Sequence, residues 1–299
     1  MKRTRFLSLL MAALLCLPLA LSAQGEALTL TDMASREITL KQPVARIIAL
    51  QASDVEILYA IGAGDLLVGR GEYANYPEAA LALPSVQSGF ETNFEQIIAL
   101  DPDVVVMTKM SQREDDTRKL EEAGILTVVS DAQNIEGVYA AIALMGRLTG
   151  KNQEAEDLVA SMRASFGEVE KLSQGKAGGS VYFEVSPLQY GLWTAGSGTF
   201  MDEIAGLLGL RNIFSDLTGW QGVSEEQVLA RDPDYIVTTA MYFGEGPNPV
   251  EEVLARPNWA QIKAVVNGRI FNADSDAITR PGPRLVDAAR AMYEFVYGK

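Results

Sequence analysis

The chain has 299 residues, of which 48% are hydrophobic and 21% charged, and it contains no histidine. This length and composition allow one large core or two medium ones, and they exclude a disordered or fibrous protein. The absence of histidine excludes Ser-His-Asp triads, Cys-His dyads, HExxH zinc sites and histidine-ligated haem, because each needs an imidazole. The formal net charge of −14 excludes nucleic acid as an expected partner, since such a surface repels phosphate backbones.

The N-terminal segment has the three parts of a secretory signal: a basic region, an apolar stretch and small residues. The basic residues lie within the first five positions, and the apolar stretch runs over residues 6–21. We predict a signal peptide over residues 1–23, with cleavage after Ser22 or Ala23. The alternative is a retained membrane anchor, but the stretch is shorter than the ~20 apolar residues that a spanning helix needs.

Cleavage would leave a mature chain without cysteine. Cys16 lies inside the apolar stretch, directly after Leu15. Lipid attachment requires a small residue immediately before the cysteine, so we do not expect a lipid anchor. The mature chain tolerates an oxidising compartment without disulfides. Loss of three basic residues lowers the formal charge from −14 to −17. We expect a soluble exported protein, in the periplasm or outside the cell envelope.

Strand and helix patterns alternate over residues 27–150, which we predict to form a first α/β lobe. The predicted strands cover residues 46–50, 67–69, 104–107 and 127–129, and the predicted helices cover 54–61 and 111–123. Helices between strands imply right-handed crossovers and a mostly parallel sheet.

A long amphipathic helix is predicted at the centre of the chain. Residues 153–173 place apolar side chains on one face and many charges on the other. About twenty residues span roughly 30 Å, which is enough to bridge two lobes. We therefore assign residues 151–173 to an interlobe helix and expect domain movement to be limited.

The same alternation returns over residues 174–299, which we predict to form a second lobe. The predicted strands cover residues 180–185, 210–214, 234–239 and 268–272, and the predicted helices cover 199–208, 225–230 and 284–297. The predicted fold class is therefore α/β, with two Rossmann-like lobes of mostly parallel sheet, one long connecting helix and a ligand cleft between the lobes.

One internal repeat relates the two lobes. The segment Glu95–Asp103 (EQIIALDPD) recurs 131 residues later as Glu226–Asp234 (EQVLARDPD), with six of nine positions identical. In each copy a capping residue, Asn93 or Ser224, precedes a short helix, and Asp-Pro-Asp stops that helix before a β-branched run. A chance helix-to-strand turn is the alternative, but the constant offset over nine positions favours duplication of a structural unit.

Residues that follow predicted strands are the first binding candidates, because open parallel sheets bind ligands beyond the carboxyl ends of their strands. The ligand-binding candidates are Tyr73, Lys109, Tyr190, Trp220, Tyr242, Asp276 and Arg280. Exposed aromatic side chains suit a large flat ligand, although each could instead cover the core from a loop. Arg280 opens a stiff RPGPR turn that could hold its guanidinium over the cleft; the alternative is a solvated loop arginine.

With this organisation, the chain resembles the substrate-binding proteins of ABC importers for ferric siderophores, haem or cobalamin, the class III periplasmic binding proteins. The resemblance covers nearly the whole mature chain. It is carried by Leu30–Asp32, Arg36–Glu37, Arg46–Leu50, Ile61–Gly64, Tyr73–Pro77, Asn93–Asp103, Thr194–Phe200, Trp220–Pro233 and Arg280–Arg284. It implies a ligand between two rigidly joined lobes, no catalytic residue, no metal ligand from the protein and no intrinsic cofactor. It also implies an ABC permease as partner, and we expect a monomer.

The resemblance also implies two docking residues. Members of this family meet arginines of the permease through one glutamate on each lobe, and by position these correspond to Glu95 and Glu226. The internal repeat relates the same two residues. The alternative is that both are first-turn glutamates that the helix dipole favours. That alternative does not explain how the two copies are placed relative to each other.

The resemblance leaves three ligand classes open. Cobalamin-binding members carry cleft residues similar to Tyr73, Trp220, Asp276 and Arg280, but a tryptophan expected beyond the third strand is replaced near Thr108. Haem-binding members supply histidine or tyrosine to iron, and only tyrosine is available here.

Siderophore-binding members use arginine, lysine and tyrosine against an anionic chelate, and Lys109, Tyr190, Tyr242 and Arg280 would serve this purpose. A chelated metal needs no protein ligands, so the missing histidines do not argue against siderophore or cobalamin. Of these classes we favour a ferric siderophore, with cobalamin second.

Two alternative hypotheses come from other functional classes. An exported hydrolase of the same architecture would need a nucleophile and a base in recognisable spacing, and the sequence has none. A sensor domain would need an output segment such as a kinase, which is also missing.

Overall fold

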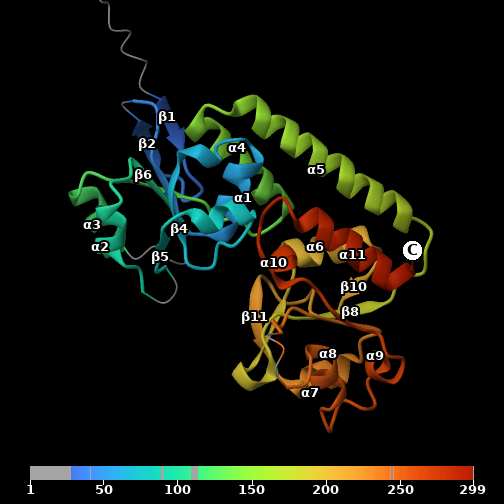
Figure 1. Cartoon of the computed structure of the whole chain (residues 1–299). Coiled ribbons are helices and arrows are strands. Elements are labelled where there is room, and N and C mark those ends of the chain that lie inside the picture. The colour runs from blue at the N-terminus through green and yellow to red at the C-terminus, as the bar shows by residue number, and fades with distance from the viewer. Residues whose placement is uncertain are drawn as a thin grey trace, which may run out of the picture.

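The computed structural model describes residues 28–40, 42–88, 91–108, 114–242, 244 and 246–298. The predicted signal peptide lies outside the described residues. Two α/β lobes lie side by side, and one long helix runs along both of them (Figure 1). Among the described residues, no helix combines the length and apolarity needed to cross a membrane.

The first lobe is built on a five-stranded sheet in which every strand pairing is parallel. The strand order is β5-β4-β3-β6-β7. The strands are β3 (Ile47–Ala49), β4 (Leu67–Gly71), β5 (Ser85–Val86), β6 (Val104–Met107) and β7 (Leu126–Val129). An antiparallel hairpin of β1 (Leu28–Thr31) and β2 (Glu37–Leu40) precedes them. The predicted parallel sheet is confirmed.

Helices cover both faces of this sheet, because its strands are apolar on both sides. The helices are α1 (Ala52–Ala60), α2 (Phe94–Ala99), α3 (Glu114–Glu122) and α4 (Ile135–Thr149). Ile47 and Ala49 of β3 join the core beneath α1 and α4. Ile48, which points the other way, joins a second core with Ile97 of α2 and Leu120 of α3.

The second lobe repeats this layering on a four-stranded parallel sheet with strand order β10-β8-β12-β13. The strands are β8 (Ser180–Glu184), β10 (Arg211–Asn212), β12 (Tyr235–Thr238) and β13 (Ile270–Asn272), and an antiparallel ribbon of β9 (Leu192–Ala195) and β11 (Trp220–Val223) lies beside them. The predicted strand at 210–214 is wrong in its second half. The Asn212 side chain accepts a hydrogen bond from the Phe214 backbone N–H at 3.1 Å, which turns the chain out of the sheet.

The helices of the second lobe are α6 (Phe200–Leu207), α7 (Glu225–Arg231), α8 (Pro249–Leu254), α9 (Lys263–Val266), α10 (Ser275–Thr279) and α11 (Leu285–Tyr297). Short 3-10 turns complete the two lobes: η1 (Gly64–Leu66), η2 (Glu78–Ala82) and η3 (Leu188–Tyr190). Val181 and Phe183 of β8 face the core shared with α6 and α11. Tyr182 faces a separate core with Val228 of α7 and Trp259.

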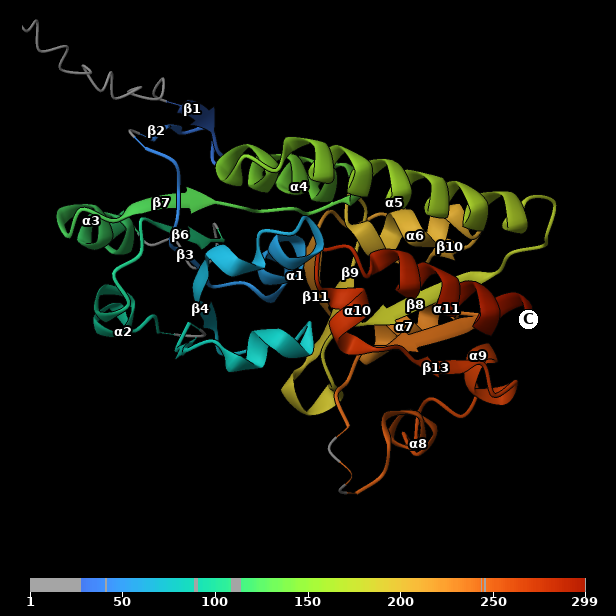
Figure 2. The same cartoon turned by 45° about the horizontal axis from the view of Figure 1, so that its top comes forward.

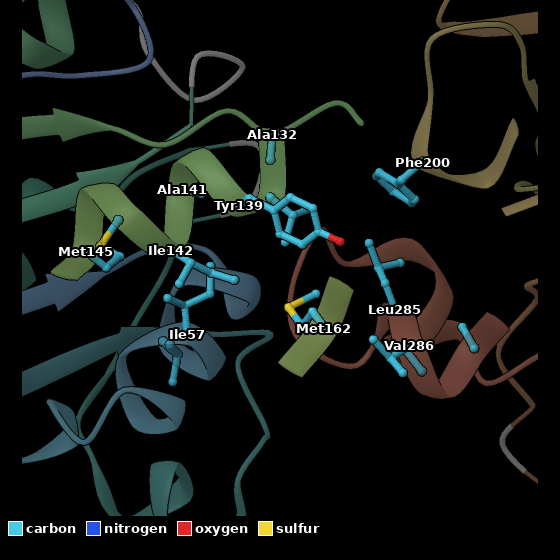
Figure 3. Close-up of a cluster of buried hydrophobic side chains, with 14 of the residues drawn as sticks. Ile57, Ala132, Tyr139, Ala141, Ile142, Met145, Met162, Phe200, Leu285 and Val286 are labelled. Atoms are coloured by element: carbon cyan, nitrogen blue, oxygen red, sulfur yellow. The ribbon is translucent and has the colours of Figure 1, made fainter. Parts of the chain in front are cut away.

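A single apolar core crosses from one lobe to the other. Helix α5 (Asn152–Ser173) packs against α4 of the first lobe and against α6 and α11 of the second. Its Met162 belongs to one cluster with Ile142 of α4 and Leu285 of α11 (Figure 3). We expect this shared core to resist movement of one lobe against the other, because opening it would expose apolar surface to water.

The two copies of the internal repeat fold alike. Asp101 and Asp232 both adopt the left-handed backbone conformation, with φ of 45° and 43°. The Asp103 carboxylate accepts hydrogen bonds from the backbone N–H groups that precede β3, including that of Arg46 at 2.9 Å. In the same way Asp234 accepts from the Ser180 N–H at the start of β8, at 2.8 Å. In each lobe the repeat therefore fixes the start of the adjacent parallel strand.

Candidate functional site

Residues that directly follow strands of both lobes line a common cavity of about 340 Å³. From the first lobe come Gln51 after β3, Thr108 after β6 and Asp131 after β7, and from the second comes Val185 after β8. The remaining lining residues are Ala132, Gln133, Phe200, Trp220, Thr279 and Pro281. The carboxyl ends of the two sheets thus meet at one cleft, as expected for parallel α/β lobes.

A second cavity, of about 620 Å³, also lies between the lobes. The first lobe contributes residues that follow β4, and the second contributes residues at the ends of β12 and β13. Its lining consists of Glu72, Tyr73, Asn75, Ala240, Met241, Tyr242, Asn272, Ala273, Asp274, Ser275, Asp276 and Arg280. Arg280 lines this cavity while its neighbours Thr279 and Pro281 line the first, so the segment after α10 separates the two.

Arg280 ties the second lobe to the first through its guanidinium. Nη2 donates to the backbone oxygen of Tyr73 at 3.0 Å and to Oδ1 of Asp276 at 2.6 Å. Nη1 donates to Oδ1 of Asn75 at 2.8 Å and to Oε1 of Glu56 at 3.0 Å. Asn75 in turn donates to Asp276 at 2.8 Å. The guanidinium is therefore held by partners from both lobes.

The buried carboxylate of Glu56 lies at the centre of this network. Glu56 belongs to α1, and its side chain is 2% exposed. Besides Arg280 it accepts from Arg284, at 2.9 Å from Nε and 2.6 Å from Nη2. This contact raises the pKa of the Arg284 guanidinium above its ordinary value, because a hydrogen-bonded carboxylate favours the charged form. Arg284 also stacks on Tyr76, 4.4 Å from the ring centroid.

Trp220 joins the lobes on the side of the smaller cavity. Its indole N–H donates to Oε1 of Gln133 in the first lobe at 3.1 Å. Its ring packs against Phe200 with the centroids 5.2 Å apart. The Gln133 backbone oxygen accepts from the Phe200 N–H at 2.9 Å. Gln133 is thus the first-lobe anchor for an aromatic pair of the second lobe.

The part of the chain that the structure describes has no group of three or more Asp, Glu, His or Cys side chains placed to hold a metal ion. What the cleft presents instead is aromatic rings, amides and carboxylates from both lobes. Such a lining suits a ligand that is large and partly flat.

Comparison with known proteins identifies this architecture. The profile of the family described as "Periplasmic binding protein" matches residues 47–277. The chain belongs to this family. As a substrate-binding protein it is not an enzyme, and the predicted fold class is confirmed.

Two curated relatives and one solved structure show how this binding protein compares with other members. It is 33% identical over 275 residues to an uncharacterized ABC transporter substrate-binding lipoprotein of Bacillus subtilis, covering 90% of this chain and 85% of that one. It is 28% identical to a vitamin B12-binding protein of Pectobacterium carotovorum, covering 83% and 86%. The solved structure, an ABC-type Fe3+-hydroxamate transport system protein of Saccharomonospora viridis, has a TM-score of 0.74 at 26% identity, covering 90% of this chain and 98% of that one.

The binding protein brings five of the predicted ligand-binding residues to the cleft. Trp220 lines the smaller cavity. Tyr73, Tyr242, Asp276 and Arg280 line the larger one. Tyr73 is 66% and Tyr242 48% exposed, so both rings are available to a ligand. Their role in binding stays a prediction.

One predicted residue that the structure describes is not brought there. Tyr190 lies in η3, is 76% exposed and is not among the described residues lining either cavity. Lys109 lies outside the described residues. Arg280 reaches the cleft, but two carboxylates already neutralise it, so it is neither a solvated loop arginine nor a free cation.

The two predicted docking residues of the binding protein occupy equivalent positions. Glu95 follows the Asn93 cap of α2, and Glu226 follows the Ser224 cap of α7. Both side chains are exposed. A hydrogen bond with the Ser224 side chain lowers the pKa of Glu226, so this residue is a carboxylate at neutral pH.

Three residues that the sequence patterns did not single out hold the lobes of the binding protein together: Glu56, Asn75 and Gln133. A signal existed for Glu56: it is followed by the apolar run Ile57–Leu58 in a helix that is mostly apolar apart from Ser53 and Asp54, and a charged side chain in such a helix needs a partner. Asn75 and Gln133 lie in loops and carry no such signal. Their roles depend on which residues of the second lobe approach them.

A second carboxyl group on α1 lies behind the smaller cavity. Asp54 is 1% exposed, and its Oδ1 accepts from the Ser130 hydroxyl at 2.7 Å. Its Oδ2 has no hydrogen-bond partner among the described residues. Burial raises the pKa of Asp54 to about 7, because desolvation penalises the charged form more than the single hydrogen bond favours it.

Proposed function

We propose that this protein is the substrate-binding component of an ABC importer and that it carries a corrinoid, either cobalamin or a related cobalt chelate, in the cleft between its lobes. Membership of the periplasmic binding protein family supports the importer role. The electrostatics of the cleft carry the choice of ligand.

The described lining of the two cavities is acidic. It holds four carboxylates, those of Glu72, Asp131, Asp274 and Asp276, and one basic side chain, that of Arg280. Because Glu56 and Asp276 already pair with Arg280, no net positive charge remains on this lining for an anionic ligand. A chelate with several negative charges would be repelled, whereas a corrinoid without net negative charge would not.

The aromatic rings and amides also match a corrinoid. Trp220 borders one cavity, and Tyr73 and Tyr242 border the other, so a flat macrocycle can contact rings from both lobes. The side-chain NH2 groups of Asn75 and Gln133 each donate one hydrogen bond to a described carboxylate, and the second N–H of each suits a peripheral amide oxygen of a corrin ring. One curated relative is named a vitamin B12-binding protein.

A ferric siderophore, which the sequence favoured, becomes the second candidate. The solved Fe3+-hydroxamate transport relative supports it. Arg280, one of the cations on which that preference rested, is neutralised in the cleft, and Tyr190 is not among the described lining residues. We therefore rank the corrinoid first.

Titration calorimetry with cyanocobalamin, dicyanocobinamide, haemin and a ferric tricatecholate tests the ligand class. We expect a dissociation constant of about 1 μM or lower for a corrinoid. Binding of the ferric chelate without binding of either corrinoid would overturn the proposal.

A pair of tryptophan variants tests the site. Trp220→Ala should weaken corrinoid binding by about tenfold or more, since it removes a ring from the smaller cavity. Trp193→Ala is the matched control, because Trp193 is 47% exposed and is not among the described lining residues. Equal losses in both variants would contradict the assignment of the site.

We also infer that Glu95 and Glu226 dock the protein to its permease, one from each lobe. The double variant Glu95→Ala/Glu226→Ala should abolish uptake of the ligand into cells while leaving its affinity for the purified protein intact. Glu154→Ala/Glu170→Ala removes two exposed carboxylates of α5 and serves as control. A matched loss of ligand affinity in the docking variant would contradict this role.

A further inference from the structure

We propose that Glu56 is a specificity-determining residue: its carboxylate neutralises Arg280, which lines the cleft, together with the neighbouring Arg284, and thereby weakens the binding of anionic chelates. This inference rests on the proposed function, since it explains how the cleft would favour an uncharged chelate over a charged one. Glu56 is not itself among the described residues lining the cavities. It acts through Arg280 and Arg284.

The charges around Glu56 balance only because Glu56 is present. Arg280 and Arg284 together carry two positive charges, and their carboxylate partners are Glu56 and Asp276. Neutralising Glu56 would leave the cluster with a net positive charge. Because the side chains of Glu56, Arg280 and Arg284 are 2%, 12% and 16% exposed, water screens this charge weakly.

The positive charge would stay at the cleft if Glu56 were neutralised. Arg280 has three other acceptors in place: the Tyr73 backbone oxygen, Asn75 and Asp276. Arg284 keeps its stacking contact with the Tyr76 ring. Neither guanidinium depends on Glu56 alone for its position.

This cluster lies where a ligand must meet it. Arg280 lines the larger cavity and the adjoining residues line the smaller one, so any molecule that fills both cavities passes the guanidinium. In Figure 2, α10, which precedes Arg280, lies beside α1, which carries Glu56. The charge state of this one contact between the lobes therefore changes the potential that a ligand meets where the two cavities adjoin, in addition to the negative charges of Glu72, Asp131 and Asp274 on the lining.

The test compares affinities for a charged and an uncharged chelate in wild type and in Glu56→Gln, a nearly isosteric change. We expect Glu56→Gln to bind a trianionic ferric tricatecholate about tenfold tighter than wild type at low ionic strength, and the gain to shrink in high salt. Cyanocobalamin should gain less than about threefold, since it has no net charge for the new field to act on.

Two further variants make the measurement specific. Glu170→Gln removes an exposed carboxylate of α5 and should leave both affinities at wild-type values, which separates a local effect from one of net charge. The double variant Glu56→Gln/Arg284→Gln removes one charge of each sign and should return tricatecholate affinity to within about threefold of wild type.

Each outcome decides the inference. If Glu56→Gln keeps a wild-type circular dichroism spectrum and gains no affinity for the tricatecholate, or if both chelates gain equally, the inference is wrong. Loss of the fold in Glu56→Gln would assign Glu56 a structural role and overturn the inference as well. Failure of the wild-type protein to bind any corrinoid would overturn the proposed function alone, because the tricatecholate ratio would still report on Glu56.

Discussion

The two lobes treat a buried carboxyl group behind the cleft in different ways. In the second lobe, Glu184 at the end of β8 is fully buried and receives two hydrogen bonds from Arg256, at 2.6 and 2.8 Å. In the first lobe, Asp54 at the start of α1 has a single hydrogen bond, from Ser130. Both carboxyl groups lie close behind the smaller cavity. Val185, the residue after Glu184, lines this cavity, and so does Asp131, the residue after the Ser130 that donates to Asp54.

The two carboxyl groups differ in how the cost of their burial is offset. Burial raises the pKa of Glu184, and the two hydrogen bonds from the Arg256 guanidinium act in the opposite direction, because they favour the charged carboxylate. Asp54 lacks such a partner and is protonated below about pH 7. Glu184 should therefore make stability depend on an intact ion pair, whereas Asp54 should make it depend on pH.

The largest expected effect comes from breaking the pair of the second lobe. Arg256→Met leaves Glu184 buried without its partner and should lower the free energy of unfolding by about 3–5 kcal/mol, measured by urea denaturation at pH 7. Arg163→Met removes an exposed pair with Glu136 and should cost less than about 1 kcal/mol. Equal losses in the two variants would contradict the distinction.

A second variant sharpens the same point. Because the penalty in Arg256→Met comes from the uncompensated carboxylate, Glu184→Gln/Arg256→Met should recover part of the lost stability. If the double variant is less stable than Arg256→Met, then Glu184 contributes more than its charge.

The first lobe should instead make stability depend on pH. Between about pH 4 and pH 7 folded Asp54 holds a proton that the unfolded chain has released, so the free energy of unfolding should fall as pH rises, by at most about 4 kcal/mol, and level off above pH 7. Asp54→Asn cannot ionise and should lack this dependence. Denaturation of both proteins at several pH values measures it, and parallel curves would refute the assignment to Asp54.

The smallest expected effects lie in the repeated helices. Ser224 forms a capping box with Gln227 at the start of α7, whereas Asn93 caps α2 by accepting from the Gln96 N–H. Ser224→Ala and Asn93→Ala should each cost about 1 kcal/mol, and Ser224→Thr should cost much less because it keeps the hydroxyl. Thermal denaturation is sensitive enough for this comparison. A loss in Ser224→Thr as large as in Ser224→Ala would contradict the cap as the cause.

The prediction from sequence failed most clearly at α4, a helix that it did not identify. Residues Ile135–Thr149 form a helix that is apolar on most of its surface, because it lies between the sheet and α5. Such a helix lacks the polar stripe by which an amphipathic helix is recognised. The antiparallel ribbon of β9 and β11 was missed as well, since its pairing joins segments separated by the whole of α6.

Sequence patterns alone predicted the two α/β lobes, the long helix between them and the repeat that carries Glu95 and Glu226. Local patterns suffice for these, because hydrophobic periodicity, caps and turns act over a few residues. The rule that parallel strands present their carboxyl ends to a ligand also predicted the place of five of the six candidates that the structure describes, all five of which line the cleft. Only the tertiary structure decided the charge of that cleft. Glu56 and Arg280 are 224 residues apart, and no local pattern records that one neutralises the other.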